Sequence, residues 1–391
     1  MQRIEEVPSD VPPASSLTHA HDELTEKDYS YSLVPAYGGQ SRQELGRGSY
    51  SIVYHGTMSD GKSVALKKSR MPYFNYKNEY DYTLERILNA FKSERIILRL
   101  IEESRKVAGI DDQAYFNCLI RYYGSHTFSE DSIQKNVFVF EFANQNNLSE
   151  WIDKKDFTWL MRLNVSHQVT MGLIALHEKC QYPIVHGDLK TSNILLHQDN
   201  GNLFAKIGDF GFSGICDDTT INQYYSPLYA EPQILLEDCP FNTKGDIWSM
   251  GVMLYELFAQ QQSYSGHKLY NFDRLVAWVV TNKQINQIST PDLYEKQAQA
   301  QVSKALAHVK KLESNLELES SSNSKTSDSL NEARLRLQET KDAVEEAKNR
   351  AKKMNSIIKS CCMFYRKDRP TATELKTQLN EIRQPSIKNT N

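Results

Sequence analysis

The sequence predicts an α+β protein with two lobes, a smaller sheet-rich lobe followed by a larger helical one. Alternating and β-branched runs in the first half predict strands at "SIVYHGTM", "SVALKK", "CLIRYYG" and "NVFVFEF". After Asn144 the apolar residues follow mostly helical spacing, as in "RLNVSHQVTMGLIALHEK" and "DIWSMGVMLYELF". At 391 residues, the chain is long enough for two domain-sized units with extensions.

The first lobe is expected to follow a flexible arm at residues 1–39, which are rich in Pro, Ser, His and acidic side chains. Asp60-Gly61 separates the first two predicted strands, so these strands should form a hairpin. Helical periodicity follows from about Tyr80 to Glu103. We therefore expect the sheet-rich lobe and its connector at 40–143 and the helical lobe at 144–385.

Residues 293–358 differ from the rest of the helical lobe in the pattern of their apolar and polar residues. Apolar residues repeat at helical spacing on both sides of the polar break "ESSSNSKTSD", which predicts an inserted antiparallel helical hairpin with facing apolar seams. The two stripes are Val302, Ala305, Val309, Leu312 and Leu316, and then Leu330, Ala333, Leu337, Thr340, Val344, Ala347, Ala351, Met354 and Ile358. The hairpin either packs only on itself or serves as a coiled-coil arm for a partner or a second copy.

The composition excludes several classes of protein. Lys+Arg 46 against Asp+Glu 49 gives a net charge of −3, so no global basic field favours nucleic acid. Six cysteines without paired metal-ligand spacing indicate reduced thiols in a cytosolic compartment. No apolar run reaches the roughly 18 residues of a membrane span, and the first residues lack a signal pattern. We expect a cytoplasmic protein without a membrane span.

A glycine-rich segment, "LGRGSYSIVYHG", lies between what should be two strands. Gly46, Gly48 and Ser51 form a G-x-G-x-x-S pattern in which glycine lets the backbone approach phosphate oxygens and offer its amide hydrogens. Ser51 replaces the third glycine of the usual pattern, and Val53 is placed to cover an adenine ring. Alone the motif is weak, and a hairpin turn without a ligand is an open alternative.

The strand "VALKK" follows and carries a candidate phosphate ligand. Lys67 would reach the α and β phosphates of a nucleotide, and Glu94 in "SERIILRLI" would hold it by an ion pair from the helix. Glu85 is the competing partner, but Leu98, one turn after Glu94, then faces the core on the same side. Without the flanking motifs, a solvated surface pair would be the default interpretation.

Two further motifs, "IVHGDLKTSN" and "AKIGDFGFS", complete a pattern that resembles the eukaryotic-type protein kinases over roughly residues 40–383. The family sequence HRDLKxxN stands here as HGDLKTSN, and Asp-Phe-Gly is intact. The resemblance implies a bilobal kinase fold that uses ATP and Mg²⁺. It implies that Asp188 accepts or orients the proton of the attacking hydroxyl and that Lys190 stabilises the transferred phosphoryl group. Asn193 and Asp209 would ligate Mg²⁺.

The connector "VFVFEFANQNNLSEWI" resembles the hinge between the kinase lobes. The resemblance places Phe140 at the back of an adenine pocket and assigns the adenine hydrogen bonds to the backbone of Glu141 and Ala143. A buried aromatic strand without a ligand is the alternative interpretation. The other pocket residues implied by the resemblance are Leu45, Ala65 and Leu195.

Downstream segments extend the resemblance and also depart from it. In "GDIWSMGVMLYEL", Asp246 would cap the backbone of the catalytic loop, and "CCMFYRKDRPTATEL" resembles the closing Arg-Pro segment with Arg369. Gly187 stands where many family members carry arginine, so activation-loop phosphorylation should have little influence. Gln233 replaces the usual glutamate partner of Arg369, and Glu231 is a candidate substitute.

The motif "HGDLKTSN" resembles the corresponding motif of the tyrosine-kinase-like group of serine/threonine kinases. We therefore expect phosphoryl transfer to Ser or Thr hydroxyls of a protein substrate. A small-molecule kinase of the aminoglycoside phosphotransferase type also carries a His-Gly-Asp loop. A pseudokinase or a coiled-coil scaffold that binds partners through the hairpin is the third possibility. The large insert in an otherwise minimal chain suits an effector that acts in the cytosol of a foreign host.

Overall fold

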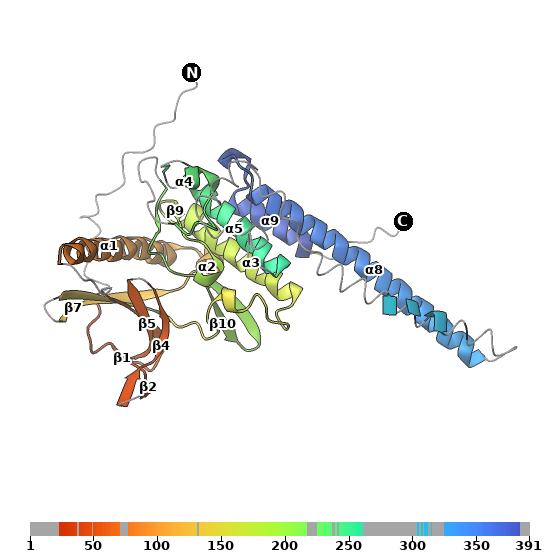
Figure 1. Cartoon of the computed structure of the whole chain (residues 1–391), viewed down its shortest axis with the longest axis horizontal. Coiled ribbons are helices and arrows are strands. Elements are labelled where there is room, and N and C mark those ends of the chain that lie inside the picture. The colour runs from red at the N-terminus through yellow and green to blue at the C-terminus, as the bar shows by residue number, and fades with distance from the viewer. Residues whose placement is uncertain are drawn as a thin grey trace, which may run out of the picture. The chain divides into compact units, whose positions relative to one another are not determined.

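The computed structural model describes residues 23–36, 39–48, 50–70, 77–130, 133–216, 225–236, 239–240, 242–260 and 324–383, with single positions between 303 and 314. The chain forms two compact units (Figure 1). The first comprises Met1–Trp151, Gln168–Ser226 and Glu237–Asp246, and the second comprises Ile152–His167, Pro227–Leu236 and Ile247–Asn391. Strands dominate the early part of the chain and helices the later part, as predicted.

An antiparallel sheet with the order β1-β5-β6-β8-β7 forms the frame of the first unit, and β4 pairs with β5 beside β1. The strands are β1 (Tyr29–Tyr31), β4 (Glu44–Arg47), β5 (Ser51–Met58), β6 (Ser63–Ser69), β7 (Tyr122–Glu130) and β8 (Ile133–Glu141). The predicted β5–β6 hairpin is confirmed, and its turn contains Gly61 at φ +88°, a value that glycine adopts without strain. Strands β2 (Leu33–Ala36) and β3 (Gly39–Arg42) form a separate hairpin.

Helix α1 (Lys77–Val107) confirms the helix predicted from about Tyr80 to Glu103. It packs on the sheet through Phe91, whose ring centroid lies 5.1 Å from that of Phe138 in β8. Leu98, two turns later, is also buried. The helix therefore has an apolar face that the sheet covers, as its sequence spacing requires.

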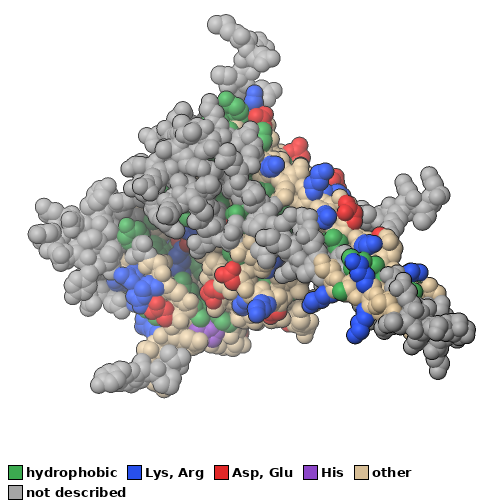
Figure 2. All heavy atoms as spheres, turned by 45° about the vertical axis from the view of Figure 1, so that its right-hand side comes forward, with side chains coloured by type: hydrophobic (Ala, Val, Ile, Leu, Met, Phe, Trp, Pro, Cys, Tyr) green, Lys and Arg blue, Asp and Glu red, His purple; other side chains and the backbone are tan. Residues whose placement is uncertain are grey.

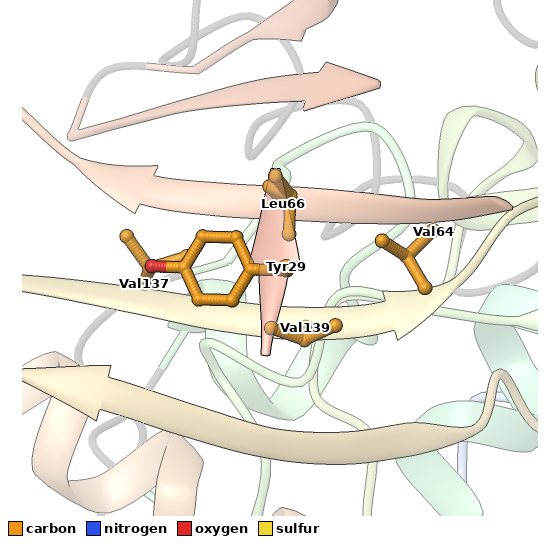
Figure 3. Packing of buried hydrophobic residues seen from close by; sticks show 5 residues of the cluster. All are labelled: Tyr29, Val64, Leu66, Val137 and Val139. Carbon is orange, nitrogen blue, oxygen red and sulfur yellow. The ribbon is translucent and has the colours of Figure 1, made fainter. Parts of the chain in front are cut away.

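The predicted flexible arm at 1–39 is wrong for the residues of β1, and residues 1–22 lie outside the described part of the chain. Tyr29 pairs with Met58 of β5 and is 8% exposed. Figure 3 shows its ring across the sheet, over Val64, Leu66 and the valines of β8. Burial of an aromatic side chain outweighs the local polarity that favoured an arm, because it removes a large apolar area from water.

Two short strand pairs hold the segments that follow in the first unit. Strand β9 (Ile184–Val185) pairs with β12 (Gly214–Ile215), and β10 (Ile194–Asp199) pairs with β11 (Asn202–Ile207). A 3₁₀ turn at Thr191–Asn193 leads directly into β10. This pairing fixes the ends of the "HGDLKTSN" loop and of the "GDFG" segment. Helix α2 (Ile110–Phe116) precedes β7.

The second unit is helical. It contains the start of α3 (Trp159–Ile174), α4 (Pro232–Leu236), most of α5 (Thr243–Ala259), α8 (Ser324–Cys361) and α9 (Ala372–Arg383). Helix α8 approaches α5 closely at Gly251, where an added Cβ would lie 2.5 Å from the Sγ of Cys362. Glycine at this position therefore permits the contact. Glu231 is buried and accepts hydrogen bonds from Arg366 and Arg369.

Part of the predicted helical hairpin lies in the described residues. Val309 forms a buried cluster with Leu330, Ala333 and Leu337 of α8. The other predicted positions of the first stripe, Val302, Ala305, Leu312 and Leu316, lie outside the described residues. Figure 2 shows Lys and Arg side chains interspersed with Asp and Glu on the visible face of the described residues. No described helix combines the length and apolarity that crossing a membrane would require.

Candidate active site

A cavity of about 470 Å³ lies in the first unit and collects nearly all of the predicted site residues. Those in its lining are Leu45, Gly46, Gly48, Ser51, Val53, Ala65, Lys67, Glu94, Phe140, Glu141, Ala143, Lys190, Asn193, Leu195 and Asp209. Asp188 is the one predicted residue that is not in the lining. It is 3% exposed and is bonded to two residues that are, Lys190 and Asn193. Residues that are far apart in the sequence of the first unit, from Leu45 to Asp209, thus line one cavity.

The glycine-rich segment forms the β4–β5 hairpin at one side of this cavity. The turn is closed by a hydrogen bond from the amide of Gly48 to the carbonyl of Ser51, at 2.8 Å. No heavy atom lies within 4 Å of a Cβ built on Gly46, and only Ser51 approaches one built on Gly48. Packing therefore does not explain the two glycines. An absent side chain leaves the backbone open toward the cavity, as a phosphate-binding loop requires.

Lys67 joins the sheet, helix α1 and the "GDFG" segment. Its Nζ lies 2.7 Å from Oε1 of Glu94 and 2.8 Å from Oδ1 of Asp209. Burial favours the neutral amine, but the charges of Asp209 and Glu94 outweigh it and raise the pKa of Lys67 above its ordinary value. Lys67 in turn lowers the pKa of Asp209, so both groups stay charged at neutral pH. The predicted preference for Glu94 as partner is confirmed; the side chain of Glu85 lies outside the described residues.

The "HGDLKTSN" loop places a lysine and an amide side chain around the carboxylate of Asp188. Oδ2 of Asp188 accepts a hydrogen bond from Lys190 at 2.6 Å and one from Nδ2 of Asn193 at 3.1 Å. Lys190 also donates to Oγ of Ser226, at 2.9 Å. The other carboxylate oxygen, Oδ1, is buried and has no hydrogen-bond partner in the described part of the chain. A buried oxygen without a partner is costly unless a ligand uses it.

Comparison with known proteins decides the family. The family described as "Protein kinase domain" matches residues 40–379. The chain belongs to the protein kinase domain family. The predicted bilobal kinase fold, with a sheet-rich N-lobe and a helical C-lobe, is therefore confirmed.

Curated relatives of this kinase domain come from Arabidopsis thaliana. Two probable LRR receptor-like serine/threonine-protein kinases share 27% and 30% identity over 68% and 65% of the chain. Phytosulfokine receptor 1 shares 24% identity over 65% of the chain. The matched segments cover 27%, 21% and 23% of those three proteins, so the chain spans roughly a quarter of their length.

Asp246, at the start of α5, fixes the backbone of the "HGDLKTSN" loop in this kinase domain. Its carboxylate accepts hydrogen bonds from the amides of His186, at 2.8 Å, and Gly187, at 3.0 Å. It also lies 2.8 Å from Nε2 of His177. Burial would raise the pKa of Asp246, but these hydrogen bonds and the neighbouring histidines lower it below its ordinary value. The predicted capping role is confirmed in its geometry.

The hinge of the kinase domain is held by its own ion pair. Oε2 of Glu141 lies 3.0 Å from Nζ of Lys206 in β11, and the amide of Glu141 donates to the carbonyl of Arg121 at 2.9 Å. Lys206 also donates to the carbonyl of Asn117, at 3.0 Å. The hinge is thereby tied to the strand that runs into Asp209.

Several lining residues of the kinase cavity were not predicted from the sequence. These are Arg47, Ile120, Phe142, Asn146, Asn147, Glu150, Ser192 and Gly208. The carboxylate of Glu150 accepts hydrogen bonds from Nδ2 of Asn146, at 2.9 Å, and of Asn147, at 3.3 Å. The run "ANQNNLSE" after the hinge was the available signal, since acid and amide side chains so close to a hinge suit a hydroxylated ligand.

Proposed function

We propose that the chain is a protein serine/threonine kinase that transfers the terminal phosphoryl group of ATP to Ser or Thr hydroxyls of protein substrates. The observation that carries the proposal is the buried Oδ1 of Asp188 beside Lys190, which has no hydrogen-bond partner among the described residues. A carboxylate oxygen without an internal partner suits the proton of an attacking hydroxyl. The names of the relatives, receptor-like serine/threonine-protein kinases, support the same reaction class.

The residues present fit Mg²⁺ as the cofactor. Mg²⁺ usually keeps several waters and takes one or two protein ligands plus substrate phosphates. The described residues contain no cluster of three or more His, Cys, Asp or Glu that would form a complete protein cage. Among the described residues, both hydrogen bonds of the Asn193 side chain use Nδ2, which leaves its Oδ1 as a metal ligand beside the cavity that Asp209 also lines. When bound, Mg²⁺ would neutralise phosphate charge.

The chain's own residues would then divide the work of the transfer. The amides of the β4–β5 hairpin and the ammonium of Lys67 would bind the phosphates, and Glu94 keeps that ammonium in position. Asp188 would orient the substrate hydroxyl and accept its proton at Oδ1. Lys190, held between Asp188 and Ser226, would stabilise charge on the transferred group. Positioning and charge are what phosphoryl transfer mainly demands.

Activity with little dependence on activation-loop phosphorylation is part of the proposal. Gly187 leaves the catalytic loop without the arginine that would bind a loop phosphate. The Lys67–Glu94 and Lys67–Asp209 ion pairs are made directly between side chains of β6, α1 and the Asp209 segment, which supports a site whose phosphate-binding lysine is already positioned. The sequence offers four candidate autophosphorylation sites. Thr219, Thr220 and Tyr224 lie outside the described residues, and Tyr225 is half-buried.

Several features remain predictions. These are the inserted hairpin at 293–358, the lobe boundaries at 40–143 and 144–385, the cytosolic location, and an effector role in a foreign host. A partner or second copy would have to use the outer face of the hairpin, because the inner seam is occupied by Val309, Leu330 and Leu337. That outer face carries an exposed Arg336–Glu332 ion pair and an exposed Leu335. No observation on these residues favours the scaffold over the enzyme.

The deciding experiment is a transfer assay with Mg²⁺, labelled ATP and a basic protein substrate, followed by mapping of phosphosites by mass spectrometry. Unmodified protein should produce phosphoserine or phosphothreonine, and Asp188→Asn should reduce the rate by at least about a thousandfold. Glu178→Gln, at an exposed position that is not in the cavity lining, serves as the control and should behave as wild type. Bound ATP without transfer in the unmodified protein would establish the pseudokinase instead.

A further inference from the structure

Residues 23–32 cross one face of the sheet and join its two edges; we name them the N-terminal strap. The amide of Leu24 donates to the carbonyl of Ser125 in β7 at 2.9 Å, and β1, farther along the strap, pairs with β5. Strands β1 and β7 stand at opposite ends of the sheet order β1-β5-β6-β8-β7. The strap lies before residue 40, where the match to the kinase family begins. It is therefore an addition of this chain to the matched domain.

Tyr29 by itself contacts strands near both ends of the sheet, β5 through its backbone and β7 through its side chain. Its backbone pairs with Met58 of β5, while its hydroxyl lies 3.0 Å from Nδ1 of His126 in β7. In a flat sheet, β1 and β7 would be about 19 Å apart, four strand spacings, which is beyond the reach of a tyrosine. The sheet is therefore curled over the Tyr29 ring. Figure 3 shows the ring among Val64, Leu66 and the valines of β8, which are fully buried beneath it.

The last residue of the strap leads toward the nucleotide cavity. Oγ of Ser32 lies 2.6 Å from Nδ1 of His55, and the amide of Ser32 donates to the carbonyl of His55 at 2.9 Å. The His55 ring stands edge-on to the ring of Phe142, with centroids 4.6 Å apart. Phe142 is a hinge residue in the lining of the cavity, between Glu141 and Ala143. Ser32 thus fixes an imidazole that in turn contacts the hinge.

A second connection runs to the glycine-rich hairpin. The amide of Gln43 donates to the carbonyl of Ser32 at 2.7 Å, and the amide of His55 donates to the carbonyl of Gln43 at 2.8 Å. Gln43 directly precedes β4, the strand that contains Gly46. Ser32 is therefore bonded to the residues that support both the hinge side and the phosphate side of the cavity.

We propose that the N-terminal strap is part of the nucleotide site, with Ser32 and His55 as positioning residues for the hinge and the β4–β5 hairpin. Loss of these contacts would weaken ATP binding and leave the transfer step unchanged, because none of them touches the Asp188 loop. The inference rests on the proposed function for the identity of the ligand, ATP. It concerns uniform binding, whose loss raises KM without lowering kcat.

The test compares Ser32→Ala with Ser30→Ala in the full chain, using calorimetric binding of a non-hydrolysable ATP analogue with Mg²⁺. Ser30 lies two residues earlier in the same strap but is exposed, and the hydrogen bond from its hydroxyl to the carbonyl of Thr57 is long, at 3.4 Å. Ser32→Ala should raise Kd and the KM for ATP about 3- to 10-fold, the effect of one lost hydrogen bond, with kcat unchanged. Ser30→Ala should match wild type.

Tyr29→Phe keeps the ring and removes only the bond to His126, so it should fold and lower the melting temperature by about 2–4 °C. Its Kd for the analogue should also rise. If both strap variants bound the analogue as tightly as Ser30→Ala, the strap proposal would be overturned while ATP binding stood. If the unmodified protein bound no analogue, the proposed function would fail, and this inference with it.

Discussion

Nη1 of Arg369 lies 2.5 Å from Oε2 of Glu231, and both side chains are fully buried. Gln233, at the position where the kinase pattern has glutamate, accepts a hydrogen bond from the same guanidinium at 2.9 Å. The charge that the pattern requires has therefore moved two residues along the chain, as the sequence suggested. Arg366 pairs with Glu231 as well, so one carboxylate serves two guanidinium groups.

Glu231→Gln should lower the free energy of unfolding by about 3–5 kcal/mol, because it leaves a buried guanidinium without its counter-ion. Gln233→Ala removes an uncharged acceptor from the same guanidinium and the hydrogen bond from Nε2 of Gln233 to the carbonyl of Phe364, and should cost only about 2 kcal/mol. Denaturant unfolding of the two variants beside wild type measures both. Equal losses would show that the ion pair contributes no more than the neutral contact.

The Lys206–Glu141 ion pair should position the hinge for ATP. Both side chains are largely buried, at 12% and 25% exposed, and Lys206 stands in the strand that leads to Asp209. Lys206→Met should raise the KM for ATP about 3- to 10-fold and change kcat little, since the lysine touches neither the phosphates nor the hydroxyl. Steady-state kinetics at varied ATP measures the change.

The matched variants for this pair are Lys206→Arg, which should restore most of the affinity, and the double variant Lys206→Met with Glu141→Gln. If the two side chains act through each other, the double variant should be no worse than Lys206→Met alone. Additive losses would mean that each residue contributes separately and that the pair does not hold the hinge.

Local motifs made much of this site predictable. Each of Gly46, Lys67, Asp188 and Asp209 stands in a short pattern whose residue types follow from phosphate chemistry, and the fold only had to bring the patterns together. All of them lie in or directly beneath one cavity. Their roles in transfer are still predictions that the assay must test.

The features that escaped prediction depend on contacts between distant residues. Tyr29 pairs with Met58 and reaches His126, but nothing in the polar segment around it marks either partner. Glu150 and the asparagines beside it form part of the cavity only because the hinge turns there, with Asn146 at φ +57°. Strand pairing across many residues leaves no periodic signal in a segment as short as β1.

Removal of phosphate should leave the activity nearly unchanged. Gly187 supplies no guanidinium for a loop phosphate, and it adopts φ +77° while its amide donates to Asp246. The loop geometry is therefore held by the backbone bond and does not need a phosphate. Treatment with a phosphatase before the transfer assay should change the initial rate by less than about twofold. A tenfold loss, reversed by preincubation with ATP, would show that a loop phosphate is required after all.

The buried thiols should be inert in the folded protein and should make it sensitive to alkali. Burial raises the pKa of Cys180 and of Cys361 to about 12. At pH 8 their thiolate fraction is then about 10⁻⁴, against about a quarter for an ordinary thiol. Iodoacetamide should label neither residue in the native protein within the time that labels both in urea, as peptide mass spectrometry would measure.

The raised pKa of the buried thiols also determines how the free energy of unfolding changes with pH. A thiol whose pKa is raised on folding contributes stability that is complete below the unfolded value of about 8.5 and is lost as the pH rises toward 12. The loss per thiol approaches about 1.4 kcal/mol for each pH unit in that window. The melting temperature of Cys361→Ala should therefore fall less between pH 8 and pH 10 than that of wild type. Parallel curves for the two proteins would contradict a raised pKa at Cys361.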